Sequence, residues 1–244
     1  MLKGKKILIT GSSSGIGEAC AEYFSKKGAE LVLVSRNKEK LLELSKGLPD
    51  KSHIYAYDLL DLQGIKNIFK FCKEEGIILD GMVHCAGMLA ECPIKSNQLN
   101  LLEEAMQLHC FSFVELGKFF SSRLYSNEGA SIVAISSVSS ISCDKGMGPY
   151  SASKAALNAI VKTMAKEFAT RKIRVNAILP AGVDTPMAAH KREIMGVSDE
   201  NAADGQPLGL ITPEAIASLA CYLLSSEARF LTGAEIPVSA GLYY

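Results

Sequence analysis

The sequence has no surplus of either charge, no long apolar run and no paired cysteine motif. Its 244 residues include 26 basic and 26 acidic side chains, so no basic surplus points to nucleic acid or anionic lipid. No apolar run approaches the roughly 18–20 residues that a membrane-spanning helix requires. We therefore expect neither a nucleic-acid partner nor a membrane partner.

The seven cysteines are scattered along the chain, and no two of them form a C-x-x-C pair. Dispersed thiols in an odd number are typical of a protein that keeps them reduced, which indicates the cytoplasm. Only four histidines accompany them, so we expect no zinc or other metal site.

Apolar runs alternate with amphipathic stretches along a chain that is 48% hydrophobic. The N-terminus starts with charges, as signal peptides do, but its apolar stretch is short and leads straight into a glycine-rich turn, which favours a strand. Strands are predicted at residues 6–10, 30–35, 53–57, 79–84, 131–136, 173–179 and 235–238. Helices are predicted at residues 16–27, 38–46, 62–75, 99–125, 150–170 and 213–225.

This alternation predicts an α/β fold, a doubly wound seven-stranded parallel sheet with helices on both faces. The sequence shows no linker and no internal repeat, so residues 1–244 are expected to form a single domain. The least patterned segment is 185–210, whose length suits a partly helical, mobile flap over a site.

The glycine-rich turn follows the first predicted strand and opens the first helix, with Gly11, Gly15 and Gly17 in the series T-G-S-S-S-G-I-G. This context lets the backbone approach a pyrophosphate and places phosphate charge at a helix N-terminus. The turn lacks the Lys-Ser/Thr ending of a P-loop, which disfavours a nucleoside triphosphate. A purely structural turn is the alternative.

The second strand ends in Ser35 and Arg36, with no carboxylate to bind the ribose 2′-hydroxyl of NAD. A guanidinium matches phosphate geometry, so the sequence favours NADP over NAD. The alternative for Arg36 is a solvated loop cation.

The strongest catalytic pattern is Tyr150-x-x-x-Lys154, which follows Ser137 at the end of a predicted strand. Residues four apart on a helix share a face, and a nearby ammonium favours a phenolate, so Tyr150 is expected to ionise more readily than a free tyrosine. Such a tyrosine can exchange a proton with a carbonyl or alcohol oxygen. Tyr23 and Lys27 repeat the spacing, but they follow no strand-end serine and are interpreted as structural.

Together these motifs resemble the short-chain dehydrogenase/reductase superfamily, in its single-domain, NADP-preferring form, and the chain is similar to 3-oxoacyl-[acyl-carrier-protein] reductases. The resemblance covers nearly the whole chain. It includes the glycine turn, Asp58, the series H-C-A-G at 84–87, the serine–tyrosine–lysine set and the segment 176–185. It implies a Rossmann-like fold and an NADP-dependent oxidoreductase that interconverts a ketone and a secondary alcohol.

The resemblance also implies roles for single residues. Tyr150 would be the general acid in reduction, Lys154 would lower its pKa and bind the nicotinamide ribose, and Ser137 would hydrogen-bond the substrate carbonyl. The cofactor-binding residues that it implies are Gly11, Ser13, Ser14, Gly15, Ile16, Gly17, Ser35, Arg36, Asp58, Leu59, Cys85, Ala86, Gly87, Tyr150, Lys154, Pro180, Val183 and Thr185.

Three positions depart from the family pattern. His109 stands where the family has an asparagine that holds a water in a proton path to the lysine. Histidine also bonds water and titrates near neutrality, so His109 is a candidate catalytic residue, with plain packing as the alternative. Cys85 replaces a supporting asparagine, and Ala181 replaces a glycine. A non-catalytic NADP-binding sensor or scaffold is therefore the competing function.

The substrate stays open at this stage. A 3-oxoacyl thioester is one candidate, and a sugar, a steroid-like or a small polar ketone is another. The loop before the fifth strand offers no cation for an acidic carrier protein, whereas Arg171, Lys172 and Arg174 are candidate docking cations. The helices predicted at 99–125 and 150–170 carry surplus apolar surface, which predicts a homo-oligomer, a dimer or tetramer.

Overall fold

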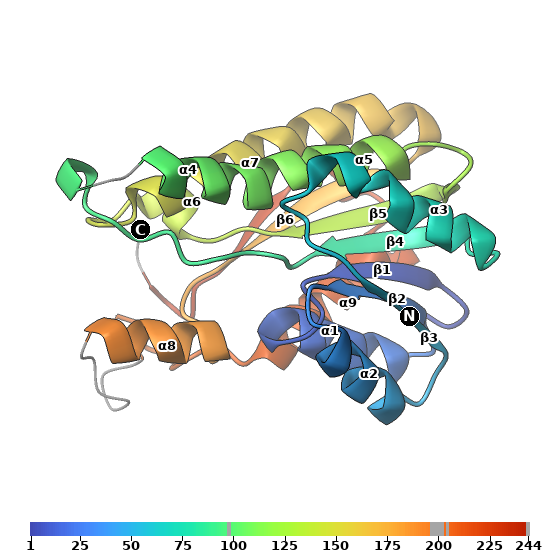
Figure 1. Ribbon diagram of the computed structural model, residues 1–244, viewed down its shortest axis with the longest axis horizontal. Helices are drawn as coiled ribbons and strands as arrows, with labels where there is room; N and C mark the ends of the chain where they lie inside the picture. Colours follow the sequence, from blue (N-terminus) through green and yellow to red (C-terminus); the bar gives the residue numbers. More distant parts are fainter. Residues whose placement is uncertain (97–98, 196–202, 204, 243–244) are drawn as a thin grey trace.

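A seven-stranded parallel sheet forms the centre of the protein in a computed structural model that describes residues 1–96, 99–195, 203 and 205–242 (Figure 1). The strand order is β3-β2-β1-β4-β5-β6-β7. The strands are β1 (Lys6–Thr10), β2 (Glu30–Ser35), β3 (Ser52–Ala56), β4 (Leu79–His84), β5 (Ser126–Ile135), β6 (Arg174–Pro180) and β7 (Glu235–Val238). The fold class and all seven predicted strands are confirmed, although β5 begins five residues earlier than the sequence predicts.

Helices cover both faces of the sheet. One face carries α1 (Gly15–Ser25), α2 (Lys38–Gly47) and α9 (Pro213–Leu224), whose apolar residues share a core cluster with alternate strand residues such as Ile7 and Ile9. The other face carries α3 (Lys66–Glu74), α4 (Leu99–Met106), α5 (Ser112–Phe120) and α7 (Gly148–Glu167). Two further helices, α6 (Ser139–Ser142) and α8 (Pro186–Met195), lie at the carboxyl ends of the strands.

The single helix predicted over 99–125 is wrong in detail. A π-helical turn, Gln107–Phe111, separates α4 from α5, and α5 ends at Phe120. Within the turn, the Ser112 hydroxyl donates to the carbonyl oxygen of Leu108 at 2.6 Å, so a side chain bonds the backbone beside the widened turn. Beyond α5 a tight turn joins β5, closed by the Tyr125 amide donating to the Ser122 carbonyl at 3.1 Å.

The remaining helices match their predictions closely. The helix predicted at 150–170 begins two residues earlier, with Pro149 in its first turn, and ends in a 3₁₀ turn, Phe168–Arg171. Further 3₁₀ turns are Leu62–Gly64, Ile94–Ser96 and Ser226–Ala228. The proposed flap at 185–210 contains α8, while residues 196–202 and 204 lie outside the described part of the chain.

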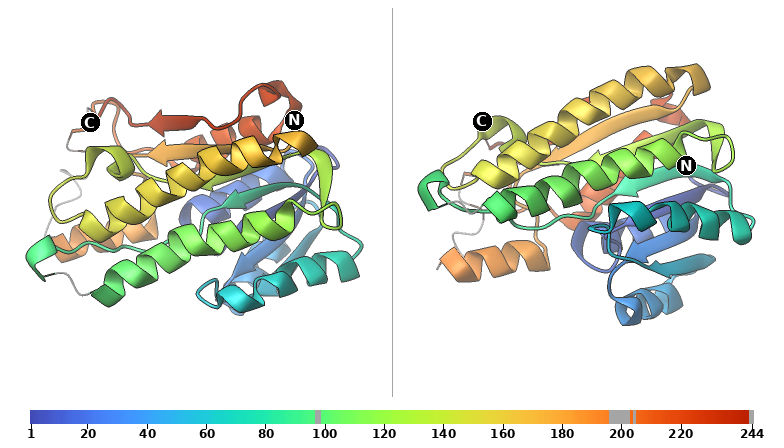
Figure 2. Two further views of the ribbon diagram at one scale, coloured as in Figure 1. Left: turned by 90° about the horizontal axis from the view of Figure 1, so that it is seen from above. Right: turned by 45° about the horizontal axis from the view of Figure 1, so that its top comes forward.

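The topology sets the place of the functional site. Strand β1 pairs with β2 on one side and β4 on the other, so the connections leave in opposite directions and open a crevice at the carboxyl ends of the strands. The α4–α5 segment and α7 run side by side across the sheet towards this edge (Figure 2). No helix in the described ranges is long and apolar enough to span a membrane.

Candidate active site

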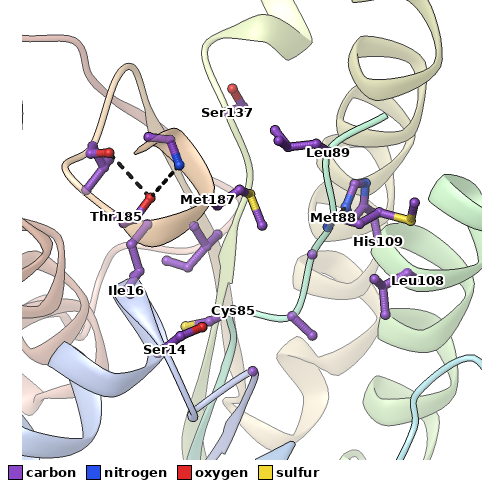
Figure 3. Close-up of a pocket in the computed structure, with 18 of the residues that line it drawn as sticks. Ser14, Ile16, Cys85, Met88, Leu89, Leu108, His109, Ser137, Thr185 and Met187 are labelled. Atoms are coloured by element: carbon purple, nitrogen blue, oxygen red, sulfur yellow. Dashed lines mark hydrogen bonds between the residues drawn. The ribbon is translucent and has the colours of Figure 1, made fainter. Parts of the chain in front are cut away.

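A cavity of about 660 Å³ opens at the carboxyl ends of the strands (Figure 3). Its walls come from the glycine turn, the ends of β2, β4 and β5, the start of α7, and the loop from β6 into α8. Every catalytic and cofactor-binding candidate from the sequence lines this cavity: Gly11, Ser13, Ser14, Gly15, Ile16, Gly17, Ser35, Arg36, Asp58, Leu59, Cys85, Ala86, Gly87, His109, Ser137, Tyr150, Lys154, Pro180, Val183 and Thr185.

The glycines of the turn stand where a side chain would not fit. Gly11 and Gly15 have φ angles of 66° and 56°, in the left-handed region that favours glycine. A Cβ added at Gly11 would lie 2.7 Å from the Ala86 nitrogen, and one added at Gly17 would collide with the Gly11 carbonyl oxygen. The bare backbone at the N-terminus of α1 therefore fits a dinucleotide pyrophosphate.

The far end of the cavity, beside β2, is polar and cationic. Ser35, Arg36, Asn37 and Lys40 line it together. The Asn37 side chain accepts a hydrogen bond from the Lys40 amide at 2.8 Å and caps α2, which fixes the backbone that carries Arg36. On the opposite wall, Asp58 accepts a hydrogen bond from the Leu60 amide at 3.0 Å.

Ser137 and Tyr150 meet at the end of β5. The Ser137 hydroxyl accepts a hydrogen bond from the Ser139 amide at 3.1 Å, and its proximity acts to lower the pKa of the Tyr150 phenol. The Tyr150 amide donates to the carbonyl of Ala90 at 3.1 Å, which ties the first turn of α7 to the loop after β4. The two hydroxyls are thus held together at the cavity wall, where one carbonyl oxygen can contact both.

The expectation that Tyr150 ionises more readily than a free tyrosine is wrong. Burial raises the pKa of Tyr150 to about 12, the Ser137 hydrogen bond opposes the shift, and the negative charge of Glu91 adds to it. The physical reason is the position of Lys154, whose Nζ donates to the Ile135 carbonyl at 2.9 Å and lies 5.7 Å from the Tyr150 ring centroid. Burial also lowers the pKa of Lys154 to about 8.

His109 lies in the π turn and is completely buried. Its Nε2 lies 3.0 Å from the Met88 amide nitrogen, and its Nδ1 lies 2.8 Å from the Ser153 hydroxyl. Its ring meets the Tyr150 ring edge to face, with centroids 5.6 Å apart. Burial and the charge of Lys154 hold the pKa of His109 well below its usual range.

Two residues that sequence reasoning did not single out also shape the site. His84 opens the H-C-A-G series and is fully buried. Its Nδ1 lies 2.9 Å from the Thr10 hydroxyl. Burial, followed by the charge of Lys154, lowers the pKa of His84 to about 3. Ser153 links His109 to α7. The sequence pattern could not indicate this role, because a serine inside a helix does not mark a contact with a distant residue. Within the described residues, no cluster of histidine, cysteine and carboxylate side chains is arranged to hold a metal ion.

The second tyrosine–lysine pair is structural, as expected. Lys27 Nζ lies 5.3 Å from the centroid of the Tyr23 ring, and Tyr23 packs against the core cluster below α1, outside the cavity.

The three candidate docking cations do not reach the site. Arg171 and Lys172 precede β6, and Arg174 opens it, at the end of the sheet opposite the cavity. Lys172 pairs with Glu128 at 2.7 Å, Arg174 donates to the Ser225 carbonyl at 3.0 Å, and Arg171 donates to the Ser126 carbonyl at 2.7 Å. These cations therefore stabilise the loops around the strand starts.

Comparison with known proteins agrees with this geometry. A family model described as Enoyl-(Acyl carrier protein) reductase matches residues 11–243. The chain is 32% identical over 245 residues to the 3-oxoacyl-[acyl-carrier-protein] reductase FabG of Thermotoga maritima, covering 99% of this chain and 98% of that protein. The chain therefore belongs to the short-chain dehydrogenase/reductase family of oxidoreductases.

Solved structures show the same fold. A short-chain type dehydrogenase/reductase from Mycobacterium ulcerans aligns with a TM-score of 0.90 at 26% identity, covering 99% of this chain and 90% of that chain. The ligand-free aldohexose dehydrogenase of Thermoplasma acidophilum aligns with a TM-score of 0.88 at 28% identity, covering 99% and 94%.

Proposed function

We propose that this protein is an NADP-dependent oxidoreductase that reduces a ketone to a secondary alcohol, or catalyses the reverse reaction. The observation that carries the proposal is the meeting of Ser137, Tyr150 and Lys154 on the wall of a cavity that the glycine turn also lines, with no room for a side chain at Gly11 and Gly17. A nicotinamide dinucleotide bound there supplies the hydride, and the protein supplies position and the proton.

Each polar group has one task in this proposal. Ser137 and Tyr150, which line the cavity together, bind the carbonyl oxygen as negative charge develops on it. The Tyr150 phenol, protonated through the neutral range because its pKa is about 12, donates the proton during reduction. Lys154 holds a cofactor ribose hydroxyl and favours the phenolate that remains after the proton has left.

The preference for NADP rests on the cationic end of the cavity. Arg36 and Lys40 line this end together with Ser35 and Asn37, so a 2′-phosphate placed there gains two cations. A planar guanidinium forms paired hydrogen bonds with phosphate oxygens, and an ammonium adds a point charge.

Two classes of substrate are candidates. A 3-oxoacyl thioester is supported by the name of the 3-oxoacyl-[acyl-carrier-protein] reductase relative. A sugar is supported by the aldohexose dehydrogenase that shares the fold. The cavity wall offers Met88, Leu89, Met147 and Met187 to an apolar chain, and Glu91 to a hydroxyl group.

The decisive experiment is NADPH oxidation measured against acyl thioesters, sugars and cyclic ketones, with Tyr150→Phe assayed in parallel. We expect turnover with at least one class and a loss of roughly 100-fold or more in the variant, because the proton donor is gone. Unchanged NADPH binding in Tyr150→Phe shows that the fold and the cofactor site are intact. Tight NADPH binding without turnover of any carbonyl would instead support the sensor function.

We further propose that the protein assembles as a homo-oligomer. Large apolar side chains remain exposed on and beside the α4–α5 segment, with Leu99 at 66%, Phe111 at 47% and Leu124 at 58% relative exposure. Large apolar side chains that stay exposed on neighbouring elements are candidates for protein–protein contacts.

A further inference from the structure

His109 sits between two parts of the candidate site that the chain brings together from far apart. Met88 belongs to the loop after β4 and lines the cavity, while Ser153 belongs to α7, three residues after Tyr150. The imidazole spans the gap with one nitrogen on each side, at 3.0 Å from the Met88 nitrogen and 2.8 Å from the Ser153 oxygen. Figure 3 shows the His109 ring beside Met88 at the cavity wall.

The hydrogen bonds fix the tautomer of this ring. The Met88 amide can only donate, so Nε2 must accept and carries no proton. In a neutral imidazole the proton then resides on Nδ1, which donates to the Ser153 oxygen. The Ser153 hydroxyl uses its own proton to donate to the Tyr150 carbonyl at 2.8 Å. The chain of hydrogen bonds runs in one direction, from the Met88 amide to the backbone of Tyr150.

In this arrangement both nitrogens of the His109 ring are held in hydrogen bonds. Both ring nitrogens are occupied, the residue is completely buried, and the neighbouring bases are Lys154 and His84. A second proton on the ring would break the bond to Met88 and add a positive charge beside Lys154. A relay residue needs a free lone pair or an accessible proton, and His109 has neither in this structure.

We propose that His109 is a positioning residue, a permanently neutral Nδ1–H imidazole that holds the Met88 loop against the α7 turn bearing Tyr150. It acts through Met88 on the substrate wall and through Ser153 on the placement of the phenol. A Cβ added at Gly87 would lie 3.2 Å from His109 Nε2, so the backbone approaches the ring closely on that side. The kinetic part of this inference rests on the proposed reductase function, whereas the tautomer does not.

The first test is ¹⁵N NMR of histidine-labelled protein between pH 6 and 9, read without any substrate. We expect the His109 signals of one neutral tautomer, protonated at Nδ1 and unprotonated at Nε2, at every pH. His109→Gln assigns the signals by their disappearance. An Nε2–H tautomer, or titration of His109 within this range, would overturn the proposal.

The second test uses matched variants to separate the effects of the two His109 hydrogen bonds, one to Met88 and one to Ser153. His109→Asn keeps a donor near the Nδ1 position and loses the acceptor for Met88, so substrate KM should rise by roughly 2- to 10-fold with kcat little changed. His109→Gln keeps an acceptor near the Nε2 position and loses the bond to Ser153, so kcat should fall instead. Ser153→Ala should lower kcat by a similar factor. The double variant should lower kcat little further, because both substitutions remove the same His109–Ser153 hydrogen bond.

The pH profile separates positioning from proton relay. As a positioning residue, His109 leaves the pH dependence of kcat unchanged in shape when it is replaced by Gln or Asn. A lost or displaced limb of the profile in His109→Gln would show that the ring handles the proton and would overturn the proposal. If the wild-type protein binds NADPH but turns over no carbonyl, the proposed function fails, while the NMR result still decides the role of His109.

Discussion

Lys154 Nζ donates a hydrogen bond to the main-chain carbonyl of Ile135 at 2.9 Å, deep in the cavity wall. The side chain is only 4% exposed, and no carboxylate is among the groups that shift its pKa. The charged form of Lys154 is therefore stabilised only by one backbone carbonyl and by the nearby Tyr150 ring. Because this stabilisation is weak, the side chain loses its proton at a lower pH than a free lysine does. The structure thus places a proton-dependent cation where the cofactor ribose is proposed to bind.

NADPH affinity should consequently fall as pH rises through about 8. Burial lowers the pKa of Lys154 to about 8, so the residue is charged below that pH and neutral above it. The dissociation constant, measured by NADPH fluorescence from pH 6.5 to 9.5, should be constant at low pH and then increase by up to roughly tenfold per pH unit. Lys154→Met should bind more weakly at pH 7 and show no such increase. A wild-type constant that does not change up to pH 9.5 would contradict the assignment.

Replacing Arg36 should change cofactor choice. Arg36→Asp removes a cation from the 2′-phosphate end and introduces a carboxylate suited to a ribose hydroxyl. We expect kcat/KM for NADPH to fall by roughly 10- to 150-fold, the value of a charge-assisted hydrogen bond, and kcat/KM for NADH to rise. Lys73→Gln, which removes a cation from α3 outside the cavity, is the control and should change neither. An NADPH preference that survives in Arg36→Asp would show that Arg36 is a solvated loop cation.

Acid should destabilise the protein below pH 6.5. The pKa of His84 is about 3 and that of His109 lies well below 6.5 in the folded state, whereas both are near 6.5 in the unfolded chain. The unfolded state therefore binds more protons, so stability is full above pH 6.5 and falls as pH decreases, by about 1.4 kcal/mol per pH unit for each group. Urea unfolding at pH 7.5, 6.0 and 5.0 measures this loss. His109→Gln should show a shallower dependence, and an identical slope would count against a neutral buried imidazole.

The glycine turn gives a steric test of the cofactor site. In Gly17→Ala the new Cβ meets the Gly11 carbonyl, which forces the turn to shift from the pyrophosphate position. We expect NADPH binding to weaken by at least roughly tenfold while the far-ultraviolet circular dichroism spectrum is retained. Gly47→Ala, at the end of α2 with no atom within 4 Å of its added Cβ, is the matched control and should bind NADPH normally. Equal NADPH affinities in the two variants would contradict the assignment of the turn to the cofactor site.

Much of the fold could be predicted because burial on both faces makes parallel strands read as continuous apolar runs. Strand β2 is such a run, with all but its first residue buried. The five added residues of β5 escaped prediction because Asn127, Glu128 and Gly129 are polar or glycine and exposed. The π turn also escaped, since one extra residue in an amphipathic helix barely changes its periodicity.

The site was predictable to a different extent. The candidate residues that follow strand ends or the glycine motif line one cavity because these segments converge at one edge of a parallel sheet. The protonation chemistry could not be predicted, because the pKa of Tyr150 depends on burial and on where Lys154 points. The tautomer of His109 depends on Met88 and Ser153, which are 21 and 44 residues away in the chain.

The exposed apolar surface beside α4–α5 should be an interface between copies of this chain. Phe111 is 47% exposed in the π turn, although the exposure of a large aromatic side chain to water is energetically unfavourable. We expect the wild-type protein to have a dimeric or tetrameric mass by light scattering at micromolar concentration, and Phe111→Glu to shift it towards the monomer. Leu42→Glu, on α2 with a similar exposure of 42%, should leave the mass unchanged because it lies over the other face of the sheet. A monomeric wild-type protein at these concentrations would contradict the assembly, since both variants would then match it.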